Sequence, residues 1–378
     1  MSRRAVLKTG LAAGAFIAAP AVLRSHDALA SSGEVNVSAW GDYFDKNTIL
    51  ADFTKATGIK VNLTTFGSNE EVENKLRAAG GKGIDILFPS VDTGPNYYKD
   101  NLLAPVDEKK FNAALVLPSL YRQSLTLGAA NRGQRFLVPF DWGTEAITYD
   151  STVVKKGYGD LSYADLFAEG LTKKVAFRQK SVVVSVAIYL DALAGKPAAE
   201  RGMALYKSED ESRKAFEAAV AFILKAKANV GAFWNNANEA TAAFKDAGCA
   251  IGQTWDTTGI LLNRDVDKKW KYTMPKEGGL AWTDTMGFGA GSTNVEQAYA
   301  LANYLFKPEV GAAFANSSGY NSAAVGADKF LSDAAKAGFA MAYPGDAIDK
   351  LWWWPMQPGF FGKLRGEYVE KLTNSLKG

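Results

Sequence analysis

The hydrophobic pattern of residues 34–88 limits the possible folds more than any other feature of this sequence. Its period switches repeatedly between the alternation of a strand and the spacing of a helix. The expected elements, starting with a strand and then alternating, are Glu34–Trp40, Thr48–Thr57, Ile59–Phe66, Glu70–Ala79 and Ile84–Phe88. This order predicts a parallel α/β sheet, whose ligands bind beyond the carboxyl ends of the strands. Trp40 and Ser90 stand at two of those ends.

A second α/β region follows, and 378 residues are enough for two domains of about 150 residues each. Its expected strands are Phe136–Pro139, Ala146–Tyr149, Lys174–Phe177 and Ala250–Trp255, and its expected helices are Val182–Ala194 and Glu209–Ala228. Later helices are expected at Asn294–Phe306, Pro308–Asn316 and Gly362–Leu376. No linker rich in Gly, Ser or Pro separates the regions, which favours two lobes joined by extended strands over tethered domains.

The amino terminus has the features of a secretory signal peptide over residues 1–30. Basic residues that include Arg3 and Arg4 precede an uncharged, Ala-rich run over 9–23, and a small-x-small sequence precedes Ser31. The paired arginines resemble the twin-arginine export motif, and an ordinary secretory signal is the alternative. Either signal predicts a soluble periplasmic protein, without a Cys after the cleavage site to carry a lipid anchor.

Charge and residue counts narrow the possible functions. The chain has 43 Lys and Arg against 40 Asp and Glu, and the predicted leader holds four of the former and one of the latter, so the mature chain has no formal net charge. This balance argues against a nucleic-acid partner. The single His, His26, lies in the leader and leaves no imidazole for a general base, a Ser-His-Asp triad or a His-ligated metal. We expect neither a metal nor a cofactor.

Two short segments are expected to be structural. Cys249, the single Cys, stands in an apolar run that predicts a buried strand, and it can form no disulfide within the chain. The Gly-rich stretch Gly287–Ser292 lacks the Lys and the spacing of a phosphate-binding loop, so a turn or hinge is expected there.

Pairings of Trp with a carboxylate near expected strand ends carry the functional signal. They are Trp40 with Asp42 and Tyr43, Trp255 with Asp256, and Trp282 with Asp284. An aromatic face attracts an ammonium group and a carboxylate accepts its N–H groups, so these pairings suit a small organic cation. They would also suit a glycosidase or sugar site, in which Trp stacks on the sugar and two carboxylates act as acid and base. Core packing is the alternative for any single Trp.

A series of short motifs runs through nearly the whole predicted mature chain. In order, they are Trp40–Tyr43, Thr54–Val61, Ser68–Glu70, Asp85–Ser90, Pro139–Thr144, Asn229–Phe233, Pro275–Gly279 leading into Trp282–Asp284, and Ser318–Asn321. With this order and spacing, the sequence resembles the extracellular solute-binding proteins of the spermidine/putrescine type, which deliver ligands to ABC importers.

The resemblance implies the type II periplasmic-binding-protein fold, an α/β fold with two lobes, each a mixed β-sheet flanked by helices. Lobe 1 would comprise 33–139 and 283–327, and lobe 2 would comprise 140–282 and 328–378. The ligand would bind in the cleft between the lobes, and binding would close them about a hinge. The protein would be a monomer without catalytic activity that presents its ligand to a membrane permease.

Ligand-binding positions of that family carry over by motif. The matching residues are Trp40, Asp42 and Tyr43 in a wall of the first lobe, Ser90 in the loop after the third strand, Trp255, Trp282 and Asp284 in the floor, Tyr320 as a later aromatic, and Gln357 as a looser match. The resemblance implies that the aromatic rings surround methylene and ammonium groups and that the acids neutralise amine charge.

The second lobe departs from this pattern. Where polyamine binders have an acidic pair, this chain has Arg178 and Lys180, either in the cleft or at a solvated helix start. The acid that some relatives place three residues after Trp255 is Thr258 here, with Asp256 beside the Trp instead. A diamine needs a carboxylate at both ends, whereas a zwitterion needs a cation at one end. The expected ligand is therefore a polyamine such as putrescine or spermidine, or a zwitterion such as γ-aminobutyrate, another amino acid or an opine-like molecule held by Arg178.

Two other functions stay open from the sequence. A secreted hydrolase would use paired carboxylates such as Asp42 and Asp284 as acid and base, and it would show turnover and a raised pKa on one acid. A sugar is a further possible ligand within the binding class.

Overall fold

The structure is a computed structural model that describes residues 33–377, so the predicted signal peptide with its twin-arginine motif lies outside the described residues. In that part of the chain the strands are β1 (Glu34–Trp40), β2 (Lys60–Phe66), β3 (Ile86–Leu87), β4 (Leu103–Ala104), β5 (Ala130–Asn131), β6 (Gln134–Arg135), β7 (Leu137–Asp150), β8 (Val175–Arg178), β9 (Val230–Trp234), β10 (Ile251–Trp255), β11 (Trp270–Thr273), β12 (Leu280–Gly289), β13 (Asn321–Ser322) and β14 (Trp352–Trp353). The α-helices are α1 (Ile49–Thr57), α2 (Asn69–Ala78), α3 (Gly94–Lys99), α4 (Pro118–Ser124), α5 (Val182–Leu193), α6 (Ala204–Lys207), α7 (Glu209–Lys225), α8 (Ala237–Lys245), α9 (Asp256–Leu261), α10 (Val295–Leu305), α11 (Pro308–Ser318), α12 (Asp333–Ala342) and α13 (Phe361–Lys377).

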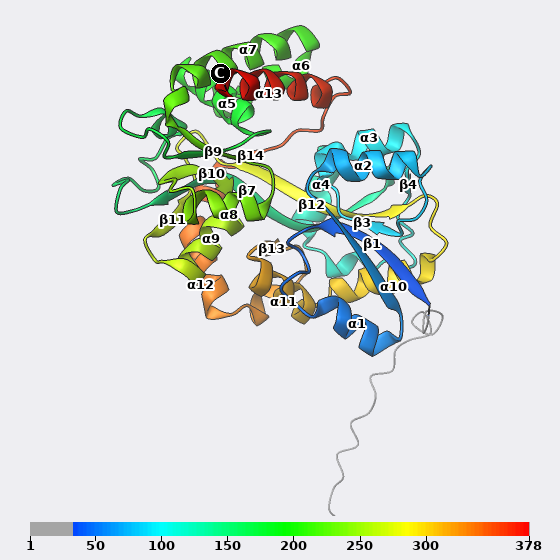
Figure 1. The fold of residues 1–378 in the computed structure, drawn as a ribbon. Helices are drawn as coiled ribbons and strands as arrows, with labels where there is room; N and C mark the ends of the chain where they lie inside the picture. The colour runs from blue at the N-terminus through cyan, green and yellow to red at the C-terminus, as the bar shows by residue number, and fades with distance from the viewer. Residues whose placement is uncertain (1–32, 378) are drawn as a thin grey trace, which may run out of the picture.

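The first lobe is built on β1, β2 and β3, with α1, α2, α3 and α10 around them (Figure 1). β1 pairs in parallel with both β2 and β3, which confirms the predicted parallel sheet. The strand predicted at Ile84–Phe88 is shorter than expected and covers only Ile86–Leu87. Trp40 ends β1 and Ser90 follows β3, so both lie at carboxyl ends of parallel strands as predicted.

Two long strands, β7 and β12, pair antiparallel and join the first lobe to the second (Figure 1). Every residue of β12 is buried, and in β7 only Trp142 is partly exposed. The strands predicted at Phe136–Pro139 and Ala146–Tyr149 are confirmed except at Phe136, but they are parts of one strand, β7, rather than separate strands. β12 gives the polar residues between them backbone partners and keeps them extended. At Gly287–Ser292, where a turn or hinge was predicted, the chain turns only after Gly289, because Gly287–Gly289 are the last residues of β12.

The second lobe continues the same sheet through β10, β8 and β9. β10 pairs antiparallel with β7 and parallel with β8, and β8 is parallel to β9. α7 packs against both α5 and α13 on this side, where Figure 1 shows the red carboxy-terminal helix beside the green helices. The three helices predicted in these places are confirmed, with ends that differ by one to three residues. Cys249 is buried as predicted, although it precedes β10 rather than lying within it.

No helix within residues 33–377 has both the length and the apolar character needed to cross a bilayer.

Candidate functional site

A cavity lies between the lobes, at the carboxyl ends of β1 and β3, and we call it the central cleft. Its lining residues are Trp40, Tyr43, Ser68, Asn69, Glu70, Ser90, Asp92, Arg178, Lys180, Ser181, Trp255, Trp282, Asp284, Tyr320, Trp354, Gln357 and Arg365. The lining thus combines three carboxylates, three cations and six aromatic rings. Such a mixture suits a small ligand that carries charge.

Asp284 is a buried carboxylate of the cleft, and it lies beside an irregularity in the pairing of β12 with β7. Asp284 pairs with Asp141 and Thr285 pairs with Pro139, so β7 has one residue more than β12 at this point. A β-bulge of this kind can re-aim neighbouring side chains. Ser90 Oγ donates to Asp284 Oδ1 at 2.5 Å, and Asn69 on α2 donates to Ser90 Oγ at 3.0 Å. Burial raises the pKa of Asp284 to about 7, although hydrogen bonds from Ser90 and Tyr43 lower it.

Tyr43 lies between two carboxylates on neighbouring strands. Its hydroxyl oxygen is 2.8 Å from Asp141 Oδ1 and 2.9 Å from Asp284 Oδ2. The hydroxyl has a single hydrogen and can donate to only one of them, so the other contact requires a protonated carboxyl group. Burial and the charge of Asp284 raise the pKa of Asp141 well above its ordinary value, which favours a shared proton on this pair of carboxyl groups. The ionised pair then carries one negative charge.

Aromatic rings line the cleft beside this acidic end. Trp282 and Tyr320 meet edge to face with ring centroids 5.4 Å apart, and Tyr320 also meets the ring of Tyr43 at 5.7 Å. Trp40 and Trp255 form another edge-to-face pair at 6.4 Å, and Trp255 continues the aromatic lining to Arg178. Gly319 adopts the left-handed conformation, with φ of 85°, at the end of α11, and the chain then turns into Tyr320. An ammonium group beside these rings would gain cation–π attraction in addition to the charge of Asp284.

Arg178 forms another part of the cleft, at the end of β8. Its Nη1 donates to Glu145 Oε2 at 2.8 Å, and Ser181 Oγ donates to the same oxygen at 2.9 Å. The guanidinium carbon lies 4.6 Å from the ring centroid of Trp255 and 5.6 Å from that of Trp234. Glu145, on β7, is fully buried. Arg178 therefore faces the cleft rather than a solvated helix surface.

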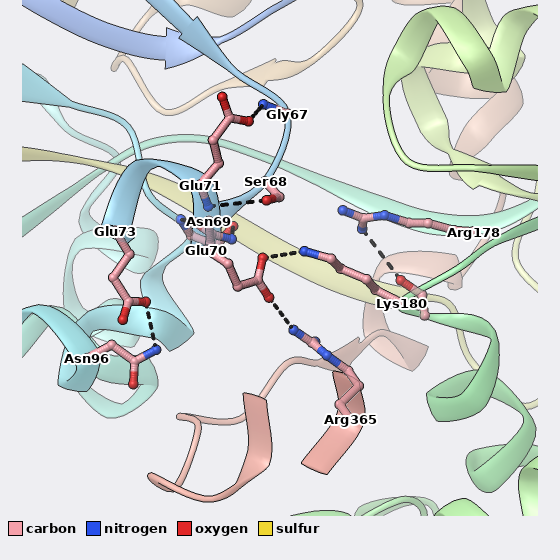
Figure 2. A network of polar contacts seen from close by, with 12 residues as sticks. Gly67, Ser68, Asn69, Glu70, Glu71, Glu73, Asn96, Arg178, Lys180 and Arg365 are labelled. Atoms are coloured by element: carbon pink, nitrogen blue, oxygen red, sulfur yellow. Dashed lines mark hydrogen bonds and ion pairs between the residues drawn. The ribbon is translucent and has the colours of Figure 1, made fainter. Parts of the chain in front are cut away.

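Glu70 connects the two lobes across the cleft through ion pairs. It projects from α2 between the ends of Lys180 and Arg365, as Figure 2 shows. Its Oε2 pairs with Lys180, and its Oε1 is 3.1 Å from Arg365 Nη2. Burial by itself would raise the pKa of Glu70, but Arg365 and Lys180 outweigh it and lower the pKa to about 2. The lobes are thus held together by charge as well as by β7 and β12.

Asp92 and Gln357 make a second contact across the cleft. Gln357 Nε2 donates to Asp92 Oδ2 at 2.7 Å, and the Gln357 backbone N–H donates to the Asp92 carbonyl at 3.0 Å. Burial raises the pKa of Asp92 to about 6, although the hydrogen bond from Gln357 lowers it. This contact connects the segment before α13 to the loop that follows β3.

The structure brings nine of the eleven predicted site residues together along the central cleft. They are Trp40, Tyr43, Ser90, Arg178, Trp255, Trp282, Asp284, Tyr320 and Gln357. Asp42 lies outside this lining, in an adjoining pocket, and its Oδ2 accepts from the Tyr320 hydroxyl at 2.7 Å. Asp256 is absent from the lining of the cleft, because β10 ends at Trp255 and Asp256 begins α9, where it is buried and accepts from the Tyr343 hydroxyl.

Sequence reasoning gave no role to several charged residues of the site. Asp141 and Glu145 carried a usable signal, since a charged residue within an apolar strand is rarely buried unless it has a partner. Asp92 and Arg365 carried none, because the local sequence does not show that their segments meet across the cleft. Residues 33–377 contain no group of three or more His, Cys, Asp or Glu side chains that could hold a metal ion.

Comparison with known proteins gives a consistent result. A model of the family described as bacterial extracellular solute-binding protein matches residues 48–342. The putrescine-binding periplasmic protein SpuD of Pseudomonas aeruginosa is 30% identical over 280 residues, covering 73% of this chain and 74% of its own. The spermidine/putrescine-binding periplasmic protein of Escherichia coli is 26% identical over 337 residues, with 88% and 89% covered. The solved structure of the spermidine/putrescine ABC transporter substrate-binding protein PotD from Streptococcus pneumoniae superposes with a TM-score of 0.69 at 25% identity, covering 92% of this chain and 99% of that chain.

Proposed function

This chain belongs to the bacterial extracellular solute-binding protein family, and from that premise we propose that it is the periplasmic ligand-binding component of an ABC importer for a small amine. The observation that carries the proposal is the acidic end of the central cleft. Asp284 supplies a buried carboxylate there, and Trp282 and Tyr320 supply aromatic faces beside it. A carboxylate and an aromatic face together bind an ammonium group through charge-assisted hydrogen bonds and cation–π attraction.

Polyamines are the first candidate ligands. The names of the relatives from P. aeruginosa and E. coli specify putrescine and spermidine, and their similarity extends over most of this chain. A zwitterion such as γ-aminobutyrate or another amino acid is the second candidate. Arg178 in the cleft favours it, because a guanidinium group binds a carboxylate with two parallel hydrogen bonds.

The mode of action would be hinge closure between two lobes. Lobe 1 would comprise 33–139 and 283–327, and lobe 2 the remaining described residues. A ligand held by both lobes contributes all its contacts only in the closed state, so binding shifts the population toward closure. The closed monomer would then dock on a membrane permease. Residues 1–30 would direct export, by the twin-arginine route if the paired arginines act as that motif.

A hydrolase that uses Asp42 and Asp284 is the rival function. Asp42 is hydrogen-bonded to Tyr320 outside the lining of the central cleft, so the two acids do not face one cavity as an acid and base pair would. We therefore expect ligand to be recovered unchanged after incubation with the protein. Product formation from any bound amine would favour the hydrolase.

A thermal-shift screen of the mature protein tests the proposal. The panel comprises putrescine, spermidine, γ-aminobutyrate, common amino acids and sugars. A ligand that binds only the folded state stabilises it by about 2.7 kcal/mol at ~100 times its dissociation constant. Stabilisation by at least one amine is expected. Stabilisation by sugars alone, or by none of the panel, would contradict the proposal.

A further inference from the structure

We infer that Arg178 occupies the position of a second ammonium group in the central cleft, so that the ligand has one ammonium group and carries a hydrogen-bond acceptor, best a carboxylate, at its other end. This inference rests on the proposed function and specifies its ligand class. It concerns the part of the cleft at the end of β8, where Arg178 lies beside the ring of Trp255.

The first observation is that the partners of Arg178 are those an ammonium group would need. A cation-binding position requires a carboxylate and an aromatic face. Glu145 supplies the carboxylate at 2.8 Å, and the ring centroid of Trp255 lies 4.6 Å from the guanidinium carbon. Trp234 adds a second ring at 5.6 Å. The cation that fills this position belongs to the protein itself.

The second observation is that Arg178 is fixed in this position. Glu145 is fully buried, and its Oε1 atom has no partner among the described residues. If a ligand displaced Arg178, the carboxylate would lose its nearest compensating charge, and a buried ion without its partner is strongly destabilising. A ligand is therefore expected to bind beside Arg178 rather than replace it.

The third observation is the local balance of charge. Arg178, Lys180 and Arg365 bring three positive charges to the cleft, and Glu145, Glu70 and Asp92 bring three negative charges. Glu145 and Glu70 are already paired with these cations, so a second ammonium group would find neither carboxylate free.

The fourth observation is the supply of hydrogen-bond donors. Both contacts of Arg178 with Glu145 and Ser181 use Nη1, so Nε–H and the Nη2 hydrogens are left for a ligand. A diamine offers only donors and would leave these groups unpaired, whereas a carboxylate accepts from them.

Calorimetric titration with ligands that share one carbon chain tests the inference. Putrescine and γ-aminobutyrate have the same length and differ only in whether one end is an ammonium group or a carboxylate, and cadaverine and 5-aminopentanoate form a second such pair. The mature wild-type protein should bind the amino acid of a pair at least about tenfold more tightly than the diamine of the same length. This expectation applies to each pair of which at least one member binds. A diamine that binds as tightly as its amino acid, or more tightly, would overturn the inference and leave the proposed function intact. No binding by any amine would overturn both.

Variants of Arg178 sharpen the test. Arg178→Gln should weaken the binding of the amino acids and strengthen the binding of the diamines, because Glu145 is then free to hold a second ammonium group. The double variant Arg178→Gln with Glu145→Gln should weaken the binding of the amino acids without strengthening the binding of the diamines. It has no unpaired buried charge, so it can be used if the single variant does not fold. Arg122→Gln, on the exposed surface of α4, is the matched control and should bind like the wild type. A preference that is the same in all four proteins would overturn the inference.

Discussion

Asp284 lies directly opposite Asp141 on the antiparallel strands β12 and β7, and both carboxyl groups contact the hydroxyl of Tyr43. Two like charges in opposed positions destabilise a sheet. The arrangement is stable when one carboxyl group keeps its proton, donates to Tyr43 and lets the tyrosine donate to the other. The acidic end of the cleft then offers one charge, which matches one ammonium group.

Asp284→Asn should weaken amine binding. The substitution keeps the shape of the side chain and removes the charge that would accept the ammonium hydrogen bonds. A hydrogen bond to a charged group contributes about 1.5 to 3 kcal/mol, so a comparable loss of binding free energy is expected in calorimetric titration. Asp160→Asn changes the same charge at an exposed position and should leave the affinity unchanged. If Asp284→Asn also binds normally, Asp284 does not hold the amine.

The same substitution should stabilise the protein without ligand. Burial raises the pKa of Asp284 to about 7, above its value in an unfolded chain, so the folded state binds more protons between about pH 4 and 7. Stability attributable to this group therefore falls as pH rises through that range. At neutral pH, Asp284→Asn should raise the free energy of unfolding, on the order of 1 kcal/mol, in a denaturant titration. A lower stability than wild type would show that hydrogen bonds to the ionised carboxylate outweigh its burial.

Amine affinity should rise with pH between about pH 5.5 and 8, because the ammonium group of the ligand stays protonated there while Asp284 ionises. Burial of Asp284 sets this range, together with hydrogen bonds from Ser90 and Tyr43. The charges of Asp92, Arg178 and Asp141 modify it further.

Titrations at several pH values in buffers of different ionisation enthalpy would measure this dependence and the protons released. Asp92, whose pKa burial raises to about 6, would contribute at the lower end of the range. In the Asp284→Asn variant, the affinity should still change with pH at the lower end of the range, where Asp92 ionises, but not at the upper end. A wild-type affinity that is constant across the range would contradict an amine site at Asp284.

Glu70→Gln should favour the open form of the protein. It removes the ion pairs from α2 to Lys180 and Arg365, and the Glu70 side chain is 46% exposed, so each pair is expected to contribute about 0.2 to 1 kcal/mol and to weaken with salt. The radius of gyration from small-angle X-ray scattering should be larger for the variant without ligand, and added salt should have less effect on it than on wild type.

Glu71→Gln, on the next residue of α2, is the matched control because Glu71 accepts from the Gly67 backbone rather than from the second lobe. A radius equal to that of wild type in Glu70→Gln would mean that Glu70 does not hold the lobes together.

The parallel strands of the first lobe and the main helices could be predicted because their signals are local. Nine residues predicted for the site line the central cleft, and some of them, such as Tyr320 and Gln357, were predicted from the family resemblance alone. Periodicity identifies strands and helices, and Trp40 or Trp282 with a nearby acid identifies a candidate cation site. The continuity of β7 could not be predicted from the polar residues at its centre, since their backbone partners come from β12, far along the chain. Local sequence predicts an element when its own residues carry the hydrophobic pattern, as those of β1 do, and fails where distant partners keep polar residues extended, as in β7.

The charge relations of the cleft show the same limit. Arg178 was visible in the sequence, but Glu145, which neutralises it, lies 33 residues away on another strand. The proton held between Asp141 and Asp284 depends on strand register and on a tyrosine from a third segment. Such couplings arise from tertiary packing, so a family resemblance alone would not reveal them.

Tyr43→Phe should distinguish the role of the Tyr43 ring in packing from the role of its hydroxyl in hydrogen bonding to the two carboxyl groups. The ring packs against Phe88, Phe140 and Phe314 and is buried, so phenylalanine should keep these contacts. Loss of the hydroxyl removes the group between the two carboxyl groups, and a buried polar group left without its partner costs about 1 to 3 kcal/mol. We expect a lower unfolding free energy, and weaker amine binding because Asp284 loses a donor that favours its ionised form. The pH dependence should shift upward with the pKa of Asp284. A variant that loses stability but keeps the wild-type pH profile would show that Tyr43 only supports the fold.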